Sequence, residues 1–222
     1  MKPLIIAIDG PSGAGKGTVA RAVADRLRFR HVDTGAMYRA VAWKALHDGV
    51  DLRDEAAVAA LAEAAIFDLE RGRVVIDGHD VAQAIRTPEI DRGATAVARL
   101  PAVRRVLVAK QRLLGEGGGV VMEGRDIGTV VFPDADVKIY LDASPEERAK
   151  RRASDPAHAG SPARPISDVA TALAERDRSD TTRADSPLSQ AADAVHVETT
   201  GLTVEAVVEH VMDVVRRRGN EN

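Results

Sequence analysis

One segment constrains the fold of this chain more than any other: GPSGAGKGT, residues 10–18. It follows the apolar run LIIAID of residues 4–9, which has the character of a buried strand, and it precedes apolar residues at helical spacing. Successive backbone N–H groups at the start of a helix form a positively polarised cradle for phosphate groups, and glycines let the backbone wrap closely. Lys16 adds a mobile charge for the β- and γ-phosphates. We therefore predict a strand, a phosphate-binding loop and a helix in succession.

The whole loop is assigned to phosphate binding: Gly10, Pro11, Ser12, Gly13, Ala14, Gly15, Lys16, Gly17 and Thr18. Gly17 stands where a Ser or Thr usually holds magnesium, so the hydroxyl is displaced to Thr18. A simple glycine turn is the alternative interpretation, but such a turn needs no lysine. A regulatory GTPase is excluded, because its Asn-Lys-x-Asp element needs an asparagine in the body of the chain and only Asn220 and Asn222 are present.

Short apolar runs alternate with longer helical stretches, a pattern typical of an α/β fold with a parallel sheet. The expected strands of the sheet are residues 4–9, 31–33, 120–123, 136–141 and 194–197. Helices are expected after the phosphate loop, over residues 35–46, 55–65, 88–99, 101–114 and 166–180, after the capping candidate Ser144, and at the end of the chain, where Val204, Val207, Val208, Val211 and Val215 share one face. The pattern thus predicts a central five-stranded parallel sheet flanked by helices.

Two segments interrupt this alternation. Residues 66–81 contain two turn signals, Arg71-Gly72 and Asp77-Gly78, between strand-like runs, which indicates a small antiparallel insert. Residues 155–165 are rich in proline and contain a glycine, so we expect a mobile loop there.

Composition excludes several classes of function. The chain has no cysteine, so disulfides, thiolate metal sites and a cysteine nucleophile are excluded. Net charge is −3 and aromatic residues make up 3%, which disfavours nucleic-acid binding. The Arg216-Arg217-Arg218 triplet is expected to complement a helix dipole. No targeting or membrane-spanning segment is visible, so we expect a cytoplasmic protein without nucleic-acid or membrane partners.

Four further polar segments follow predicted strands, the insert or the proline-rich loop. They are DTGAMYR at residues 33–39, residues 85–104 after the insert, EGRDIGTVVFPDA at residues 123–135, and residues 175–183 with the sequence ERDRSDTTR. Together with GPSGAGKGT, and in this order, these motifs resemble those of bacterial cytidylate kinases. The resemblance covers essentially the whole chain, and EGRDIGTVVFPDA is its most specific part.

The resemblance implies a nucleoside monophosphate kinase fold with one domain over residues 1–222. Its core would comprise about 1–60, 100–145 and 187–222, its acceptor-binding insert about 61–99 and its closing lid about 146–186. By this resemblance the enzyme transfers the γ-phosphoryl group of ATP, with Mg²⁺, to CMP or dCMP.

The resemblance also assigns roles to individual residues. Arg39, Arg125 and Arg183 would bind the acceptor phosphate. Thr95, Arg104 and Asp126 would face cytosine, and Asp180 would bind the sugar hydroxyls. Lys16 and Arg176 would contact the transferred phosphoryl group, while Thr34 is a further substrate-binding residue. Thr18 or Glu123 is the candidate magnesium contact, directly or through water.

The chemistry of the reaction fits these assignments. Cytosine presents an N4–H₂ donor beside the N3 and O2 acceptors, which suits a carboxylate acceptor at Asp126 and a guanidinium donor at Arg104. Uracil would turn an oxygen toward that carboxylate, at a cost of about 1–3 kcal/mol. The acceptor phosphate oxygen is already anionic, so catalysis needs alignment and charge neutralisation rather than a general base.

Alternatives remain open at the level of sequence. The chain could be a kinase for UMP or another small molecule, or a nucleotide-responsive binding protein. Arg148, Lys150, Arg151 and Arg152 could form a solvated helix face, Arg176 and Arg178 could make surface pairs, Arg125 and Asp126 could pair locally, and Asp9 could brace the phosphate loop. Nothing in the sequence requires more than a monomer.

Overall fold

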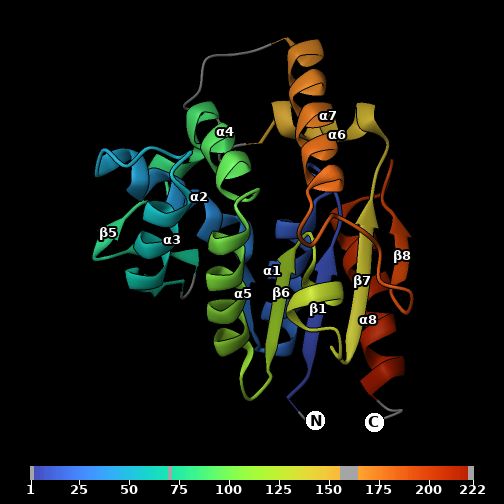
Figure 1. Ribbon diagram of the computed structural model, residues 1–222. Helices are drawn as coiled ribbons and strands as arrows, with labels where there is room; N and C mark the ends of the chain where they lie inside the picture. Colours follow the sequence, from blue (N-terminus) through green and yellow to red (C-terminus); the bar gives the residue numbers. More distant parts are fainter. Residues whose placement is uncertain (1–2, 70–71, 156–164, 220–222) are drawn as a thin grey trace.

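Five parallel strands form the central sheet of the protein. The computed structural model describes residues 3–69, 72–155 and 165–219. The strand order is β2-β6-β1-β7-β8 (Figure 1), and every neighbouring pair is parallel. The bounds are β1 Ile5–Asp9, β2 Arg30–Asp33, β6 Val120–Gly124, β7 Val137–Asp142 and β8 Val195–Glu198. The predicted five-stranded parallel sheet is therefore confirmed.

Strand β1 lies at the centre of the sheet and is buried on both faces. Ile6 and Ile8 pack in the cluster that α1 and α8 cover, whereas Ala7 packs in the cluster on the opposite face, beside α5. A strand enclosed in this way is apolar throughout instead of alternating with polar residues, which explains the continuous run IIAID that ends at Asp9.

The helices agree with the predicted ranges to within a few residues at each end. They are α1 Lys16–Leu27, α2 Thr34–His47, α3 Glu55–Ala64, α4 Pro88–Val97, α5 Pro101–Gly115, α6 Pro145–Ala153, α7 Ile166–Thr182 and α8 Val204–Gly219. Ser144 accepts the Glu147 N–H at 3.2 Å and so caps α6 as predicted. Thr87 caps α4 in the same way, by accepting the Ile90 N–H at 3.2 Å.

The insert is a three-stranded antiparallel sheet at one side of the molecule. Its strands are β3 Phe67–Asp68, β4 Val75–Ile76 and β5 His79–Asp80. Asp77 and Gly78 both have positive φ, 49° and 81°, as a tight two-residue hairpin turn requires, which confirms that predicted turn. Arg71 of the other predicted turn, and residues 156–164 of the predicted mobile loop, lie outside the described residues.

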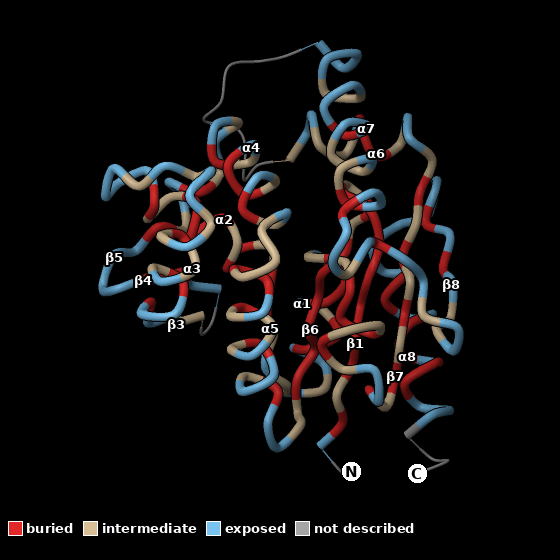
Figure 2. Tube along the Cα trace, in the orientation of Figure 1, coloured by how far each residue is buried: buried red, intermediate tan, exposed pale blue. Residues whose placement is uncertain are grey.

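Helix α8 closes one face of the core with valines, as Figure 2 shows by the burial along its inner side. Val207, Val208, Val211 and Val215 are buried as predicted. Val204, although it shares this face, is 43% exposed. The reason is its place at the first turn, where the helix borders the cavity described below instead of the sheet.

Asp9 connects β1 to the segment after β6. Its carboxylate accepts the N–H groups of Ile127 and Gly128 at 2.8 and 2.7 Å, and it is 5% exposed. These residues open a short helical turn, Ile127–Val131, that the sequence analysis did not predict. Asp9 therefore braces this turn, and the two hydrogen bonds do not go to the phosphate loop as the alternative interpretation supposed.

We predict that Asp9→Ala lowers the free energy of unfolding by about 2–4 kcal/mol, because two buried backbone donors lose their acceptor. Urea denaturation followed by circular dichroism measures this change. Asp25→Ala on the exposed side of α1 is the matched control and should change stability by less than about 0.5 kcal/mol. Equal stability of the Asp9→Ala protein and the wild type would contradict the bracing role.

Candidate active site at the edge of the sheet

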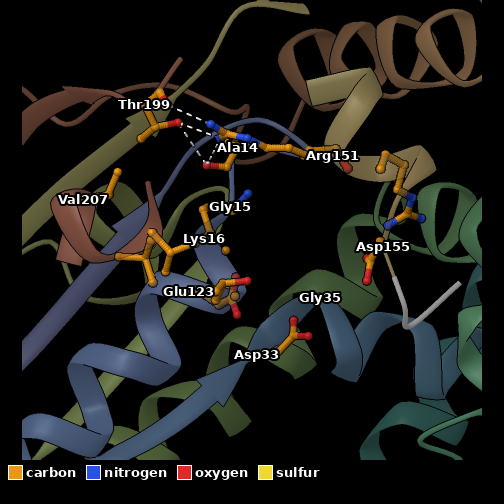
Figure 3. Close-up of a pocket in the computed structure, with 18 of the residues that line it drawn as sticks. Ala14, Gly15, Lys16, Asp33, Gly35, Glu123, Arg151, Asp155, Thr199 and Val207 are labelled. Carbon is orange, nitrogen blue, oxygen red and sulfur yellow. Dashed lines mark hydrogen bonds between the residues drawn. The ribbon is translucent and has the colours of Figure 1, made fainter. Parts of the chain in front are cut away.

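A cavity of about 440 Å³ opens where the strands β1 and β6 end at their carboxyl sides. The phosphate loop, the start of α2, the end of β6 and the helices α6 and α7 all contribute to its wall. Figure 3 shows Lys16, Glu123 and Asp33 around this space, with Arg151 and Thr199 above it. In open parallel sheets ligands bind at this edge, because loops from several strands meet there.

The phosphate loop has the backbone shape that the sequence predicts. It runs from the end of β1 into α1, and Gly10, Gly13 and Gly15 have positive φ. A Cβ on Gly10 would lie 1.9 Å from the carbonyl oxygen of Leu141, so only glycine fits beside β7. Among the predicted loop residues, Ser12 through Thr18 line the cavity, whereas Gly10 and Pro11 support them from behind.

Lys16 is buried beneath the loop, with 6% exposure, and its Nζ donates to the carbonyl oxygen of Pro11 at 2.7 Å. Burial lowers the pKa of this ammonium group to about 7, and repulsion from Arg125 and Arg176 contributes. An anionic ligand on the loop would favour the charged form. We therefore expect lysine protonation to be coupled to phosphate binding at this position.

Glu123 explains why residue 17 is glycine. A Cβ on Gly17 would lie 3.0 Å from the Glu123 Oε1, so a Ser or Thr would crowd the carboxylate. His31 Nε2 lies 3.0 Å from the same oxygen. Glu123 and Thr18 both line the cavity and offer oxygen atoms, the donors that Mg²⁺ prefers. The donor set beside the phosphate loop thus fits a magnesium ion.

Arg39 and Arg176 also line the cavity, from α2 and α7. Arg39 Nε donates to Asp91 at 3.2 Å, and Arg176 Nη1 lies 3.5 Å from the same carboxylate oxygen. Burial, with repulsion from Arg125 and Arg39, lowers the pKa of Arg176 to about 10. Arg176 is thus turned into the cavity wall, and the surface-pair interpretation of this residue was wrong.

A second group of predicted residues forms a buried charge network next to the cavity. Arg104 Nη2 donates to the Asp126 carboxylate, and Arg183 Nη2 lies 3.6 Å from the other Asp126 oxygen. Arg125 Nε donates to Asp180 at 2.9 Å. The Arg104 guanidinium also lies over the Tyr38 ring, 5.7 Å from its centroid. Arg125 and Asp126 therefore pair with distant residues, and their predicted alternative as a local pair was wrong.

Several nitrogens of these arginines are buried and have no hydrogen-bond acceptor among the described residues. They are Arg39 Nη1, Arg104 Nε and Nη1, Arg176 Nε and Arg183 Nη2. Buried donors are nearly always satisfied in folded proteins, and a charged donor left without an acceptor is costly. Such a cluster indicates a polar or anionic ligand.

The two threonines of the predicted substrate site make local hydrogen bonds. Thr34 Oγ1 donates to the Glu123 carbonyl at 2.7 Å, and Thr95 Oγ1 donates to the Asp91 carbonyl at 2.9 Å. Neither residue lines the cavity as defined by the described residues. Their hydroxyls keep acceptor capacity for a further donor.

Sequence reasoning missed other parts of this site. A solvated helix face was one of the alternatives for Arg148, but this residue is 9% exposed and donates to the Ser12 carbonyl at 3.1 Å and to Asp177. Arg151 and Arg152 line the cavity. Only Lys150 is exposed as that interpretation required. Asp91 was not assigned at all, since an acidic residue in the first turn of a helix usually just complements the dipole.

Comparison with known proteins identifies relatives along the whole chain. The family model described as cytidylate kinase matches residues 6–217. A cytidylate kinase from Solibacter usitatus is 52% identical over 219 residues, covering 98% of this chain and 94% of that protein. A bifunctional pantoate ligase/cytidylate kinase from Prochlorococcus marinus is 48% identical over 96% of this chain, which spans 43% of that longer protein.

Among solved structures, an uncharacterized protein from Eubacterium ventriosum aligns over 96% of this chain and 98% of its own, with a TM-score of 0.52 and 10% identity. This likeness concerns the fold alone.

In the described part of the chain, no helix has the length and apolar character needed to cross a membrane.

The lowered pKa of Lys16 predicts proton uptake on binding of ATP. Above about pH 7 the buried amine is largely neutral, and the phosphate charge raises its pKa, so the complex holds about one more proton than its parts. Affinity for ATP should therefore fall as pH rises above 7. Titration calorimetry near pH 8.5 in two buffers of different ionisation enthalpy measures the uptake.

Lys16→Met is the control, because it removes the titrating group from the loop. This variant should bind ATP more weakly, without the uptake that the wild type shows. A wild-type enthalpy that is the same in both buffers would contradict the coupling.

Proposed function

The chain belongs to the cytidylate kinase family, and from that premise we propose that it transfers the γ-phosphoryl group of ATP to CMP or dCMP. The products are ADP and CDP or dCDP. The observation that carries the proposal is the position of Arg125. Its guanidinium lines the cavity of the phosphate loop and also pairs with Asp180 in the buried network, so it joins the two halves of a two-substrate site.

On the donor side, the phosphate loop would hold the triphosphate through backbone N–H groups, with Lys16 and Arg176 at the transferred group. Both side chains border the same cavity. A transferring phosphoryl group spreads negative charge over its oxygens, and a well-placed arginine accelerates related reactions by about 10³–10⁵. The unsatisfied Nε of Arg176 supports this role.

Magnesium would be held near Glu123 and Thr18, with water completing its shell. When bound, the ion supplies charge neutralisation of the phosphates. His31, at 3.0 Å, keeps the Glu123 carboxylate in place, and the absence of a side chain on Gly17 leaves room for it.

On the acceptor side, Arg39, Arg125 and Arg183 would bind the phosphate of CMP. Arg39 and Arg183 each carry a buried nitrogen without a described acceptor, which supports this assignment. Asp180, 6% exposed, would accept from a sugar hydroxyl. Because this contact does not require the 2′-hydroxyl specifically, dCMP is included as a substrate.

The base would be read by Asp126 and Arg104, with Thr95 and Thr34 as further hydroxyl contacts. The buried ion pair with Arg104 fixes the position of the Asp126 carboxylate, and this carboxylate would accept a hydrogen bond from the exocyclic amine of cytosine. Arg104 keeps two nitrogens without described acceptors, which could donate to the base.

The same proposal extends to the organisation of the molecule. Residues of about 61–99 would form the acceptor-binding insert and residues of about 146–186 the lid that excludes water, on a core of about 1–60, 100–145 and 187–222.

We propose a monomer, since one chain supplies every group assigned above. A cytoplasmic location follows from the substrates ATP and CMP, and light scattering after size exclusion tests the monomer.

The first experiment mixes the purified protein with MgATP and, separately, CMP, dCMP, UMP, AMP, GMP and shikimate, and measures ADP formation. We expect strong activity with CMP and dCMP and weak activity with UMP. Lys16→Met is the control and should reduce turnover by orders of magnitude. Activity with UMP alone would keep the kinase and remove the base assignments, whereas ATP binding without acceptor-dependent ADP would indicate a binding protein.

For the base site we predict that Asp126→Asn reduces the preference for CMP over UMP by about ten- to a hundredfold, because an amide no longer distinguishes a donor from an acceptor on the base. The ratio of kcat/KM for the two acceptors measures it. Asp134→Asn, at an exposed carboxylate near the end of the same motif, is the control and should leave the ratio unchanged. An unaltered ratio in the Asp126 variant would remove this residue from base recognition.

A further inference from the structure

Asp91, in the first turn of α4, joins helices from different parts of the chain. Its Oδ1 accepts from Arg39 Nε of α2 at 3.2 Å and lies 3.5 Å from Arg176 Nη1 of α7. Its Oδ2 accepts from Arg152 Nη2 of α6. In Figure 1 the helices α4, α6 and α7 lie at the same end of the molecule. One carboxylate thus contacts guanidinium groups from three helices.

The arginines that meet at Asp91 repel one another. Repulsion from Arg39 lowers the pKa of Arg176 and of Arg152, in addition to the effect of burial. Burial would raise the pKa of Asp91, yet attraction to the three guanidinium groups more than offsets it and holds this pKa below its ordinary value. The carboxylate is therefore the local counter-charge that lets the arginines lie close together.

The geometry leaves part of the Arg39 and Arg176 guanidinium groups for a ligand. Arg39, Arg152 and Arg176 all line the cavity, whereas Asp91 is not among the described residues that line it. Asp91 takes Nε of Arg39 and Nη1 of Arg176, while Arg39 Nη1 and Arg176 Nε have no described acceptor. The carboxylate contacts the arginines from behind and does not fill the place where phosphate would bind.

We propose that Asp91 is a positioning residue that ties α6 and α7 to α2 and α4 through Arg152, Arg176 and Arg39, and so assembles the phosphate side of the cavity without help from a nucleotide. The pairing needs no bound phosphate, since the chain itself supplies the anion. The inference rests on the proposed function, because it assigns the assembled arginines to phosphate binding.

Other contacts between these helices are weaker. Arg99, two residues beyond the end of α4, donates to Ser179 of α7 at 3.3 Å, a contact that lacks a counter-charge. Asp33 lies 3.9 Å from Arg39 and 3.8 Å from Arg86, on the α2 side only. Asp91 is therefore the carboxylate that spans the two sides in the described structure.

Loss of the Asp91 carboxylate should therefore affect KM much more than kcat. Without the carboxylate, the arginines repel one another, and α6 and α7 move away from α2 and α4. Part of the binding energy of the substrate phosphates must then be used to bring the helices back together. The apparent affinity for substrate equals the intrinsic affinity multiplied by the fraction of molecules that remain assembled. At saturating substrate the phosphates themselves neutralise the arginines, so kcat changes much less than KM.

A distance measurement tests the assembly without any assay of activity. The chain has no cysteine, so spin labels can be placed on cysteines introduced at exposed Arg105 of α5 and Glu175 of α7. In the protein without nucleotide, pulsed electron resonance should give a narrow distance distribution. The distribution should broaden and shift to longer distances with Asp91→Asn, and Asp91→Glu should restore part of the short distance.

Steady-state kinetics with ATP and CMP gives the second readout. Asp91→Asn should raise KM for CMP by about tenfold and change kcat by less than about threefold, with partial rescue by Asp91→Glu. Glu89→Gln, in the same helical turn but exposed, is the control and should match the wild type in both readouts. Thermal denaturation checks that each variant is folded.

Each outcome decides a separate point. A distance distribution unchanged by Asp91→Asn, or a lower KM, would overturn the proposal. If Asp91→Asn does not fold, Arg152→Gln tests the same assembly, because it removes one contact and should broaden the same distribution. A wild-type protein that forms no ADP with CMP would contradict the proposed function but leave the distance result valid.

Discussion

The structure depends on the close packing of many cationic groups at one edge of a buried sheet. Lys16, Arg39, Arg125 and Arg176 line a single cavity, and burial lowers the pKa of Lys16 and of Arg176. Such a group is stable only if anions from the chain or from a ligand compensate it. The fold supplies some of those anions and leaves several guanidinium nitrogens without acceptors, which is the electrostatic condition for binding polyphosphates.

The carboxylates of the site pair with different arginines. Asp126 pairs with Arg104 and Asp180 pairs with Arg125, while Asp91 pairs with Arg39. Glu123 lies apart, beneath the phosphate loop and beside His31. Each carboxylate therefore compensates a different subset of the positive charge. Under the proposed function, this separation would allow recognition of a neutral base next to strong attraction of phosphate groups.

Local sequence patterns gave most of the fold. Three local signals predicted their structures correctly: the apolar run before Gly10, the proline at the start of α5 and the Asp77-Gly78 turn. Each acts over a few residues, so it can be interpreted without the rest of the chain. The turn at Ile127–Val131 was missed because its stabilising acceptor, Asp9, is more than a hundred residues away. Helical periodicity put Val204 on the same face as the buried valines, but it did not show the point at which the core ends.

For the candidate site, the sequence alone determined the chemistry: a phosphate loop with Lys16, and arginines and carboxylates in motifs that resemble those of one enzyme family. The tertiary structure decided which charges meet. Arg125 pairs with Asp180 and not with its neighbour Asp126, and Arg148 turns inward to Ser12 and Asp177. Asp91 meets three arginines from separate helices. Ion pairs form between groups that packing brings within a few ångströms, and distance along the chain carries no information about that packing.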